Sequence, residues 1–127
     1  DSMDIMWHGH YVKYLEMARC QFLEEIGYTY DVMKKQGFGW PIVQLNIKYV
    51  NPALFRQKIR IELKVVEYET CLRIDYVIFD AKTNQKLTTA STTQVAVSMQ
   101  TREMQLQTPP CWQSAVKTHP TFVSEGE

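Results

Sequence analysis

The feature that most constrains this chain is a change in the spacing of its apolar residues, from a helical period to a strand period. Between residues 11 and 26 the apolar side chains recur every three or four positions, which predicts one amphipathic helix that Gly27 ends. Further along, apolar and polar residues alternate, and this spacing predicts half-buried strands. A long helix followed by strands indicates an α+β fold, in which the helix covers the apolar face of an antiparallel sheet.

The alternating pattern predicts four strands, each an antiparallel neighbour of the next. They cover residues 43–49, 59–65, 72–78 and 87–99. Pro52 ends the first strand, and the polar segment 80–85 is typical of a hairpin connection. A shorter helix is expected at residues 30–36, before Gly37.

The chain of 127 residues has the size of one domain. We predict that this domain covers residues 1–110, where two prolines end the last strand, and that residues 111–127 form a C-terminal tail. Periodicity in the tail is weak, although Trp112, Ala115 and Val116 have the spacing of one helical turn.

Charge and cysteine content disfavour several classes of function. The 14 basic and 14 acidic residues cancel, which argues against binding to nucleic acid or to an anionic membrane surface. The apolar runs are too short to span a bilayer, and no leading segment suggests secretion. The three cysteines are an odd number and far apart in the sequence, which favours reduced thiols in a cytoplasmic protein.

Chemically versatile residues gather in residues 1–11, directly before and at the start of the long helix. Two carboxylates, two imidazoles and a glycine occur there, at Asp1, Asp4, His8, Gly9 and His10. A helix N-terminus carries unpaired backbone N–H groups and a partial positive charge, so it can stabilise a developing oxyanion. The two histidines and the carboxylates could instead bind a metal. Because no second group of ligands with matching spacing follows, we expect no metal site.

The same segment carries an ordered motif: an Asp, an apolar pair, an aromatic residue, a histidine and a helix-entry aromatic residue. These positions are Asp1, Ile5, Met6, Trp7, His8 and Tyr11. Two further motifs follow, Tyr-x-Glu-x-Ala-Arg at residues 14–19 and Tyr-x-x-Pro-Ala at residues 49–53. Together they resemble the 4-hydroxybenzoyl-CoA thioesterase family. The resemblance implies the hotdog fold, in which a curved antiparallel sheet wraps a long helix.

The sequence departs from the family pattern at three positions. Asp4 stands where the family has Gly or Asn, His10 where Asn is common, and Gln57 where an Asp often closes the Pro-Ala link. The hotdog fold also has a strand before the active-site Asp. We therefore expect the protein to extend upstream of Asp1.

The resemblance implies a mechanism with assigned residues. Asp1 is the expected catalytic carboxylate, which either attacks the thioester carbonyl or activates a water molecule that does so. The backbone N–H of His8 is expected to polarise the carbonyl oxygen. Five residues could line an acyl pocket: Trp7, Gly9, Tyr11, Tyr14 and Trp40. The four aromatic residues of this set could alternatively belong to the core.

The implied substrate is an acyl-CoA, with coenzyme A as part of the substrate and no separate cofactor. Its phosphates could meet cationic side chains near strand ends, although such side chains are more often simply solvated. The candidates are Lys48, Arg56, Lys58 and Arg102. The resemblance also implies a homodimer whose sheets join, or a homotetramer, with the active site at a subunit interface.

Three other functions stay open at this point. The acyl group could be carried by acyl carrier protein, and the neutral net charge gives only a slight preference for coenzyme A. Hydratases share the fold, but their motif resembles Asp-x-Asn-Pro-x-His. Here Asp1 and His8 are seven positions apart with no Asn-Pro between them, which disfavours a hydratase. The third is a non-catalytic domain that binds an acyl ligand or serves only for assembly. The sequence does not specify the acyl group.

Overall fold

The computed structural model describes residues 8–51, 58–117 and 121–126. Its helices are α1 (His8–Glu25), α2 (Tyr30–Lys35) and α3 (Pro110–Lys117). Its strands are β1 (Phe38–Gly39), β2 (Ile42–Tyr49), β3 (Ile59–Glu67), β4 (Leu72–Asp80), β5 (Lys86–Gln94), β6 (Val97–Ser98) and β7 (Thr121–Gly126). The predicted long and short helices correspond to α1 and α2, and α1 begins earlier than expected.

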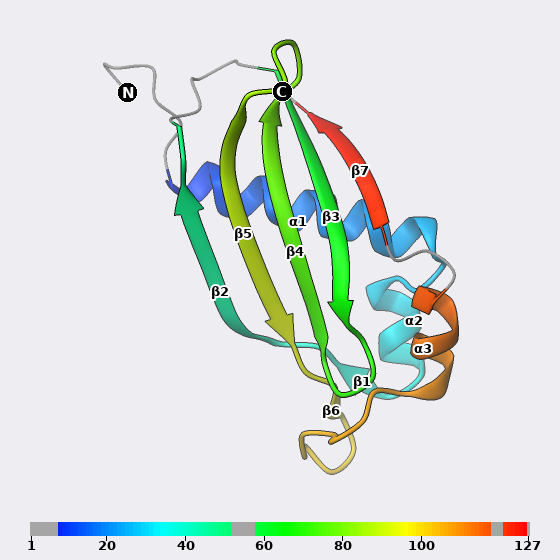
Figure 1. Ribbon diagram of the computed structural model, residues 1–127. Helices are drawn as coiled ribbons and strands as arrows, with labels where there is room; N and C mark the ends of the chain where they lie inside the picture. The colour runs from blue at the N-terminus through cyan, green and yellow to red at the C-terminus, as the bar shows by residue number, and fades with distance from the viewer. Residues whose placement is uncertain (1–7, 52–57, 118–120, 127) are drawn as a thin grey trace.

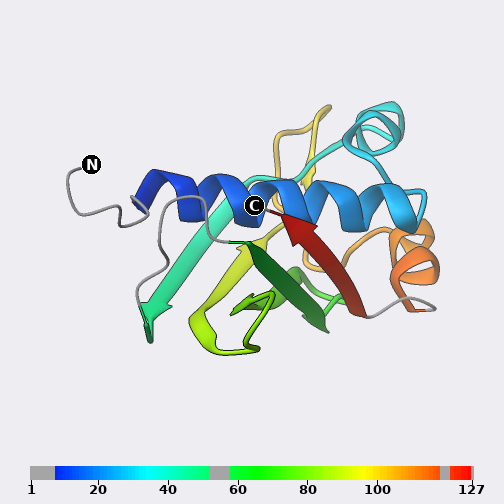
Figure 2. The same cartoon turned by 90° about the horizontal axis from the view of Figure 1, so that it is seen from above.

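Within the described residues, five strands form one antiparallel sheet in the order β2-β5-β4-β3-β7. The sheet curves around α1, which crosses its inner face (Figures 1 and 2). The N-terminus of α1 lies on the β2 side of the molecule, and its C-terminus lies on the side of α3 (Figure 2). This arrangement is the predicted α+β hotdog fold.

The alternating sequence pattern turns every second side chain of the sheet toward α1. On β3 and β4 the inward side chains are buried: Ile59, Ile61, Leu63, Val65, Leu72, Ile74, Tyr76 and Ile78. The helix supplies the facing layer, which includes Tyr11, Leu15, Ala18 and Phe22. Burial of one large apolar side chain contributes roughly 1.5–3 kcal/mol, so the contact between these two layers holds the fold together.

The fourth predicted strand, at residues 87–99, is two separate strands in the structure. β5 ends at Gln94, and β6 pairs with β1 in a second, two-stranded sheet. The chain leaves the main sheet at Val95, whose backbone N–H donates a hydrogen bond to the carbonyl oxygen of Pro41. The prediction of one continuous strand is therefore wrong. Alternation of side chains reports a strand conformation but not a change of pairing partner.

The segment after residue 110 packs against the rest of the chain. α3 buries Trp112 completely, with its ring centroid 5.0 Å from that of Tyr28 and 5.3 Å from that of Trp40. β7 then pairs with β3 and forms the edge of the sheet opposite β2. The strand expected ahead of Asp1 lies outside the described residues, and the division of the chain at residue 110 stays a prediction.

Replacement of Trp112 should destabilise the fold strongly. Trp112→Ala removes a buried indole from the cluster it forms with Tyr28 and Trp40, so we expect the free energy of unfolding to fall by about 3–5 kcal/mol. Urea denaturation measures this loss. The matched control is Ser114→Ala, an exposed change in the same helix, which should alter the free energy by less than about 0.5 kcal/mol. Equal stability of the two variants would contradict the packing described here.

Candidate active site

The N-terminus of α1 is the element on which the candidate site is built. The helix is 18 residues long and begins at His8. The backbone N–H groups of a first helical turn have no carbonyl partner within the helix, and they carry the positive end of its dipole. The predicted oxyanion donor, the amide of His8, belongs to this turn. The side chains of residues 8–10 lie outside the described part of the structure.

The first turns of α1 meet the end of β2 through two tyrosines. Tyr11 is buried, and its ring centroid lies 4.9 Å from that of Tyr49 at an interplanar angle of 73°. Tyr49 is 49% exposed. Partial burial, together with the nearby Tyr11, raises the pKa of the Tyr49 phenol. The pair therefore places an aromatic surface and a protonated hydroxyl at the end of β2 that adjoins the helix start.

Sequence reasoning identified Tyr11 but did not single out Tyr49 as a site residue. The signal was present in the alternation of β2, because Leu45, Ile47 and Tyr49 share the face that turns toward the helix. What the alternation could not indicate is that α1 crosses the sheet at the end of this strand.

Several predicted residues cannot be placed in the site. Asp1, Trp7 and Arg56 lie outside the described residues. Tyr14 is half-buried and packs against the core in the second turn of α1. Its role in substrate binding stays a prediction.

Trp40 lies far from the start of the helix. It precedes β2, whereas Tyr49 ends this eight-residue strand, and a strand of that length spans roughly 25 Å. Trp40 instead contacts Tyr28 and Trp112 in the aromatic cluster. The structure therefore does not bring Trp40 together with Tyr11, and no substrate contact for Trp40 is established.

The cationic candidates are distributed over both ends of the sheet. Lys48 and Lys58 are exposed at one end, because β2 ends where the antiparallel β3 begins. Arg102 follows the turn after β6 and has a left-handed φ of 62°. β6 lies at the other end of the sheet (Figure 1). Of the three candidates that the structure describes, the two lysines are thus near the end of β2 that meets α1.

Arg19 makes a buried polar connection between α1 and its surroundings. Only 5% of the residue is exposed, and its Nε donates a hydrogen bond to the hydroxyl of Tyr30 at 3.1 Å. Burial opposes the charge of the guanidinium, but Tyr76 and Tyr30 outweigh this effect, and the pKa of Arg19 is raised. Tyr76 in turn shares a hydrogen bond of 2.8 Å with Thr92. These contacts join α1, α2, β4 and β5, and so fix the helix against the sheet.

Neither a metal centre nor a membrane-crossing helix occurs in the part of the chain that the structure describes. No three His, Cys, Asp or Glu side chains of these residues are grouped so that they could hold an ion. No helix within the same residues is both long enough and apolar enough to cross a bilayer. The carboxylates and imidazoles of residues 1–10 lie outside the side chains described.

Architecture and site together define a hotdog-fold protein, and solved structures agree with this class. A hypothetical protein from Thermus thermophilus superposes with a TM-score of 0.80 at 24% identity, covering 93% of this chain and 88% of that chain. The DHNA-CoA thioesterase from Staphylococcus aureus also has a TM-score of 0.80, at 27% identity, covering 93% of this chain and 80% of that chain.

Residues 1–122 match the thioesterase-like superfamily, and the chain therefore belongs to this family. Among sequence relatives, YneP of Bacillus subtilis is named as a candidate acyl-CoA thioesterase. It is 28% identical over 68 residues, which cover 54% of this chain and 49% of YneP. The match thus spans about half the length of that relative.

The buried phenol of Tyr76 should make stability depend on pH in the alkaline range. Burial is the main reason that the pKa of Tyr76 is raised, so the folded state holds this proton more tightly than the unfolded state does. The resulting stabilisation is complete below the usual tyrosine pKa of about 10 and is lost as the pH rises through the folded-state pKa.

Tyr76→Phe should therefore lower the free energy of unfolding by about 1–2 kcal/mol near neutral pH, through loss of the hydrogen bond to Thr92. This cost should shrink above about pH 10. Urea denaturation at a series of pH values measures both effects. Thr92→Val removes the same hydrogen bond but keeps the phenol, so it should retain the alkaline loss of stability. Parallel pH profiles for wild type and Tyr76→Phe would rule out the titration of Tyr76 as the cause.

Proposed function

We propose that this protein hydrolyses acyl-CoA thioesters to a carboxylate and free coenzyme A. The observation that carries the proposal is the start of α1 at His8, seven positions after the motif carboxylate Asp1. The match to the thioesterase-like superfamily supports the proposal, because the matched residues 1–122 include both Asp1 and His8. The names of the Staphylococcus and Bacillus relatives, which refer to CoA thioesters, favour this function over hydration or an acyl carrier protein substrate.

In the proposed reaction, Asp1 supplies the carboxylate. It either attacks the thioester carbonyl carbon directly or takes a proton from a water molecule that attacks. As the new C–O bond forms, an electron pair moves to the carbonyl oxygen, where the His8 amide and the helix dipole stabilise the negative charge. Collapse of this intermediate breaks the C–S bond and releases the thiolate of coenzyme A. In the covalent route, water then hydrolyses the resulting anhydride and restores Asp1.

The acyl group that we propose to test first is aromatic. The S. aureus structure is named a DHNA-CoA thioesterase, and the start of α1 offers the edge-to-face pair of Tyr11 and Tyr49. Aromatic rings pack favourably against such pairs. Short and long straight-chain acyl groups form the rest of the substrate panel.

We further propose that the protein acts as a homodimer joined along β2. This strand is at the edge of the sheet and is exposed on both faces, with Val43 58% and Leu45 39% exposed. An exposed apolar strand at the edge of a sheet is a template for pairing with another strand. Because the start of α1 adjoins Tyr49 at the end of β2, such pairing brings the candidate site to the subunit interface.

Loss of the Asp1 carboxylate should abolish most of the activity. Asp1→Asn keeps the shape of the side chain but removes the nucleophile or base, so kcat should fall by about two to four orders of magnitude. Thiol release from the acyl-CoA panel measures the effect. Asp4→Asn, which alters the neighbouring carboxylate, should have a much smaller effect. Unchanged hydrolysis by Asp1→Asn would show that Asp1 does not have the assigned role.

Charges placed on β2 should separate the proposed dimer. Light scattering should give a dimer for the wild type and a monomer for Val43→Lys/Leu45→Lys, because paired edges would then face each other with like charges. The control is Val66→Lys, which introduces a lysine at an exposed valine of β3, away from this edge, and should leave the dimer intact. A monomeric wild type would exclude the assembly.

A further inference from the structure

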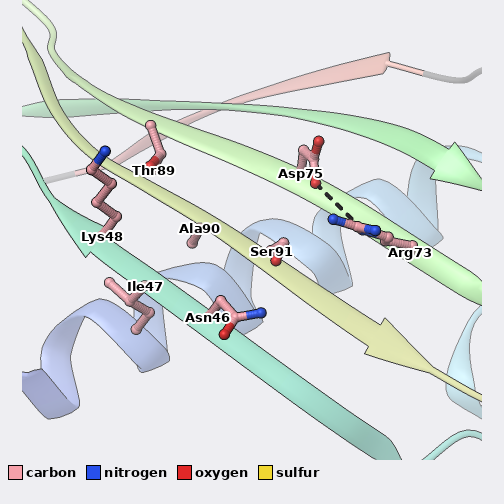
Figure 3. A pocket seen from close by; sticks show the side chains of 8 residues that line it. All are labelled: Asn46, Ile47, Lys48, Arg73, Asp75, Thr89, Ala90 and Ser91. Carbon is pink, nitrogen blue, oxygen red and sulfur yellow. Dashed lines mark ion pairs between the residues drawn. The ribbon is translucent and has the colours of Figure 1, made fainter.

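The outer face of the sheet, opposite α1, carries a polar groove along β5. The groove has a volume of about 320 Å³, which lies within the range of small-molecule sites. It exists because Thr89 and Ser91 present short side chains between longer ones on both neighbouring strands (Figure 3). One wall is formed by Asn46 and Lys48 of β2, and the other by Arg73 and Asp75 of β4 (Figure 3).

Cationic groups lie at two separated positions along this groove. Lys48 is opposite Thr89, whereas Arg73 is opposite Thr93. The two backbones are therefore two strand spacings apart, roughly 10 Å, and four residues apart along the strands, roughly 13 Å. Hydroxyl and amide groups occupy the space between them. An elongated ligand with anionic groups some distance apart and hydroxyl groups between them matches this pattern.

The carboxylates near the groove leave it with an excess of positive charge. Asp75 faces Arg73 at 3.9 Å, and both side chains are about half exposed, so this ion pair is weak. Lys64 of β3 is paired in register with Asp75. Glu67, opposite Arg73, already accepts hydrogen bonds from backbone N–H groups of its own turn. Lys48 forms no ion pair with any described residue.

We propose that this groove binds the phosphorylated ribose of coenzyme A, with Lys48 and Arg73 on its phosphate groups, Thr89, Ser91 and Asn46 along the sugar, and Asp75 accepting from a sugar hydroxyl. The proposal rests on the proposed acyl-CoA hydrolysis. It names a part of the substrate that lies away from the reacting carbon.

The position of the groove is compatible with a thioester that reacts at the start of α1. Lys48 and Tyr49 are consecutive residues of β2, so their side chains point to opposite faces of the sheet. Tyr49 contacts Tyr11 of α1 on the inner face, and Lys48 lines the groove on the outer face. The two sites are separated by one layer of sheet at the end of a strand. Packed layers are roughly 10 Å apart, and the extended pantetheine arm of coenzyme A is longer than this.

Calorimetric titration with adenosine 3′,5′-bisphosphate tests the groove without requiring turnover. Lys48→Ala/Arg73→Ala should weaken binding by at least about tenfold, because each charge-assisted hydrogen bond lost is worth a factor of this order. Lys34→Ala/Lys35→Ala, at two exposed positions of α2, is the control for loss of two positive charges and should bind as the wild type does. Equal binding by the double variant and the wild type would overturn the proposal.

A second pair of variants tests the shape of the groove and leaves its charges in place. Ser91→Ile fills the groove, whereas Thr121→Ile places the same side chain on β7, opposite Lys64 and outside the groove. The first should abolish nucleotide binding, and the second should preserve it. If inorganic phosphate at equal concentration displaces the bisphosphate, the groove recognises phosphate alone and the assignment to a ribose is wrong.

Kinetics separate this proposal from the proposed function. The double variant should lose at least about tenfold in kcat/KM for an acyl-CoA, while kcat/KM for the same acyl-pantetheine, which lacks the nucleotide, should not change. Equal losses for both substrates would contradict a nucleotide site. If the wild type hydrolyses neither substrate, the proposed function fails, and the calorimetric titration still decides whether the groove binds the nucleotide.

Discussion

The burial of one stripe of α1 against the inner face of the sheet is the contact on which the other features of this protein depend. Tyr11, Leu15 and Phe22 face the buried residues of β3 and β4. This packing fixes the position of both ends of the helix relative to the sheet. The polar contacts of Arg19 with Tyr30 and Tyr76 lie at the same junction. Because the helix direction is set in this way, its N-terminal amides remain at the end of β2, where the motif carboxylate precedes them in sequence.

Much of this arrangement could be predicted from local patterns in the sequence. Each periodic pattern marks one apolar face that becomes buried on folding. This holds for the helical period of residues 11–26 and for the alternation of residues 59–65 and 72–78. Each of these patterns lies within one helix or strand, so it can be recognised in the sequence without knowledge of the tertiary contacts. The resemblance to thioesterases added an expected catalytic role for Asp1, which stays a prediction, and an expected oxyanion donor at the start of the helix, both from residue order in one short segment.

Features that depend on distant partners were not accessible in the same way. Where the chain leaves the sheet, the backbone N–H of Val95 donates a hydrogen bond to the carbonyl oxygen of Pro41, and no local pattern indicates that contact. Trp112 lies in a segment with weak periodicity, yet it is completely buried between Tyr28 and Trp40. The outer groove is also a property of three neighbouring strands, since short side chains on β5 form a groove only when longer ones stand on either side.

The place of β7 in the sheet has a consequence for how the protein folds during synthesis. Among the described residues β7 is the strand synthesised last, but it pairs with β3, which is made much earlier. On the ribosome, the edge of β3 that pairs with β7 therefore has no partner strand until more than fifty further residues have been synthesised. Contacts between segments so distant in sequence slow folding, and unpaired strands expose nascent chains to aggregation. Synthesis of residues 121–126 is thus the step that ends this exposure.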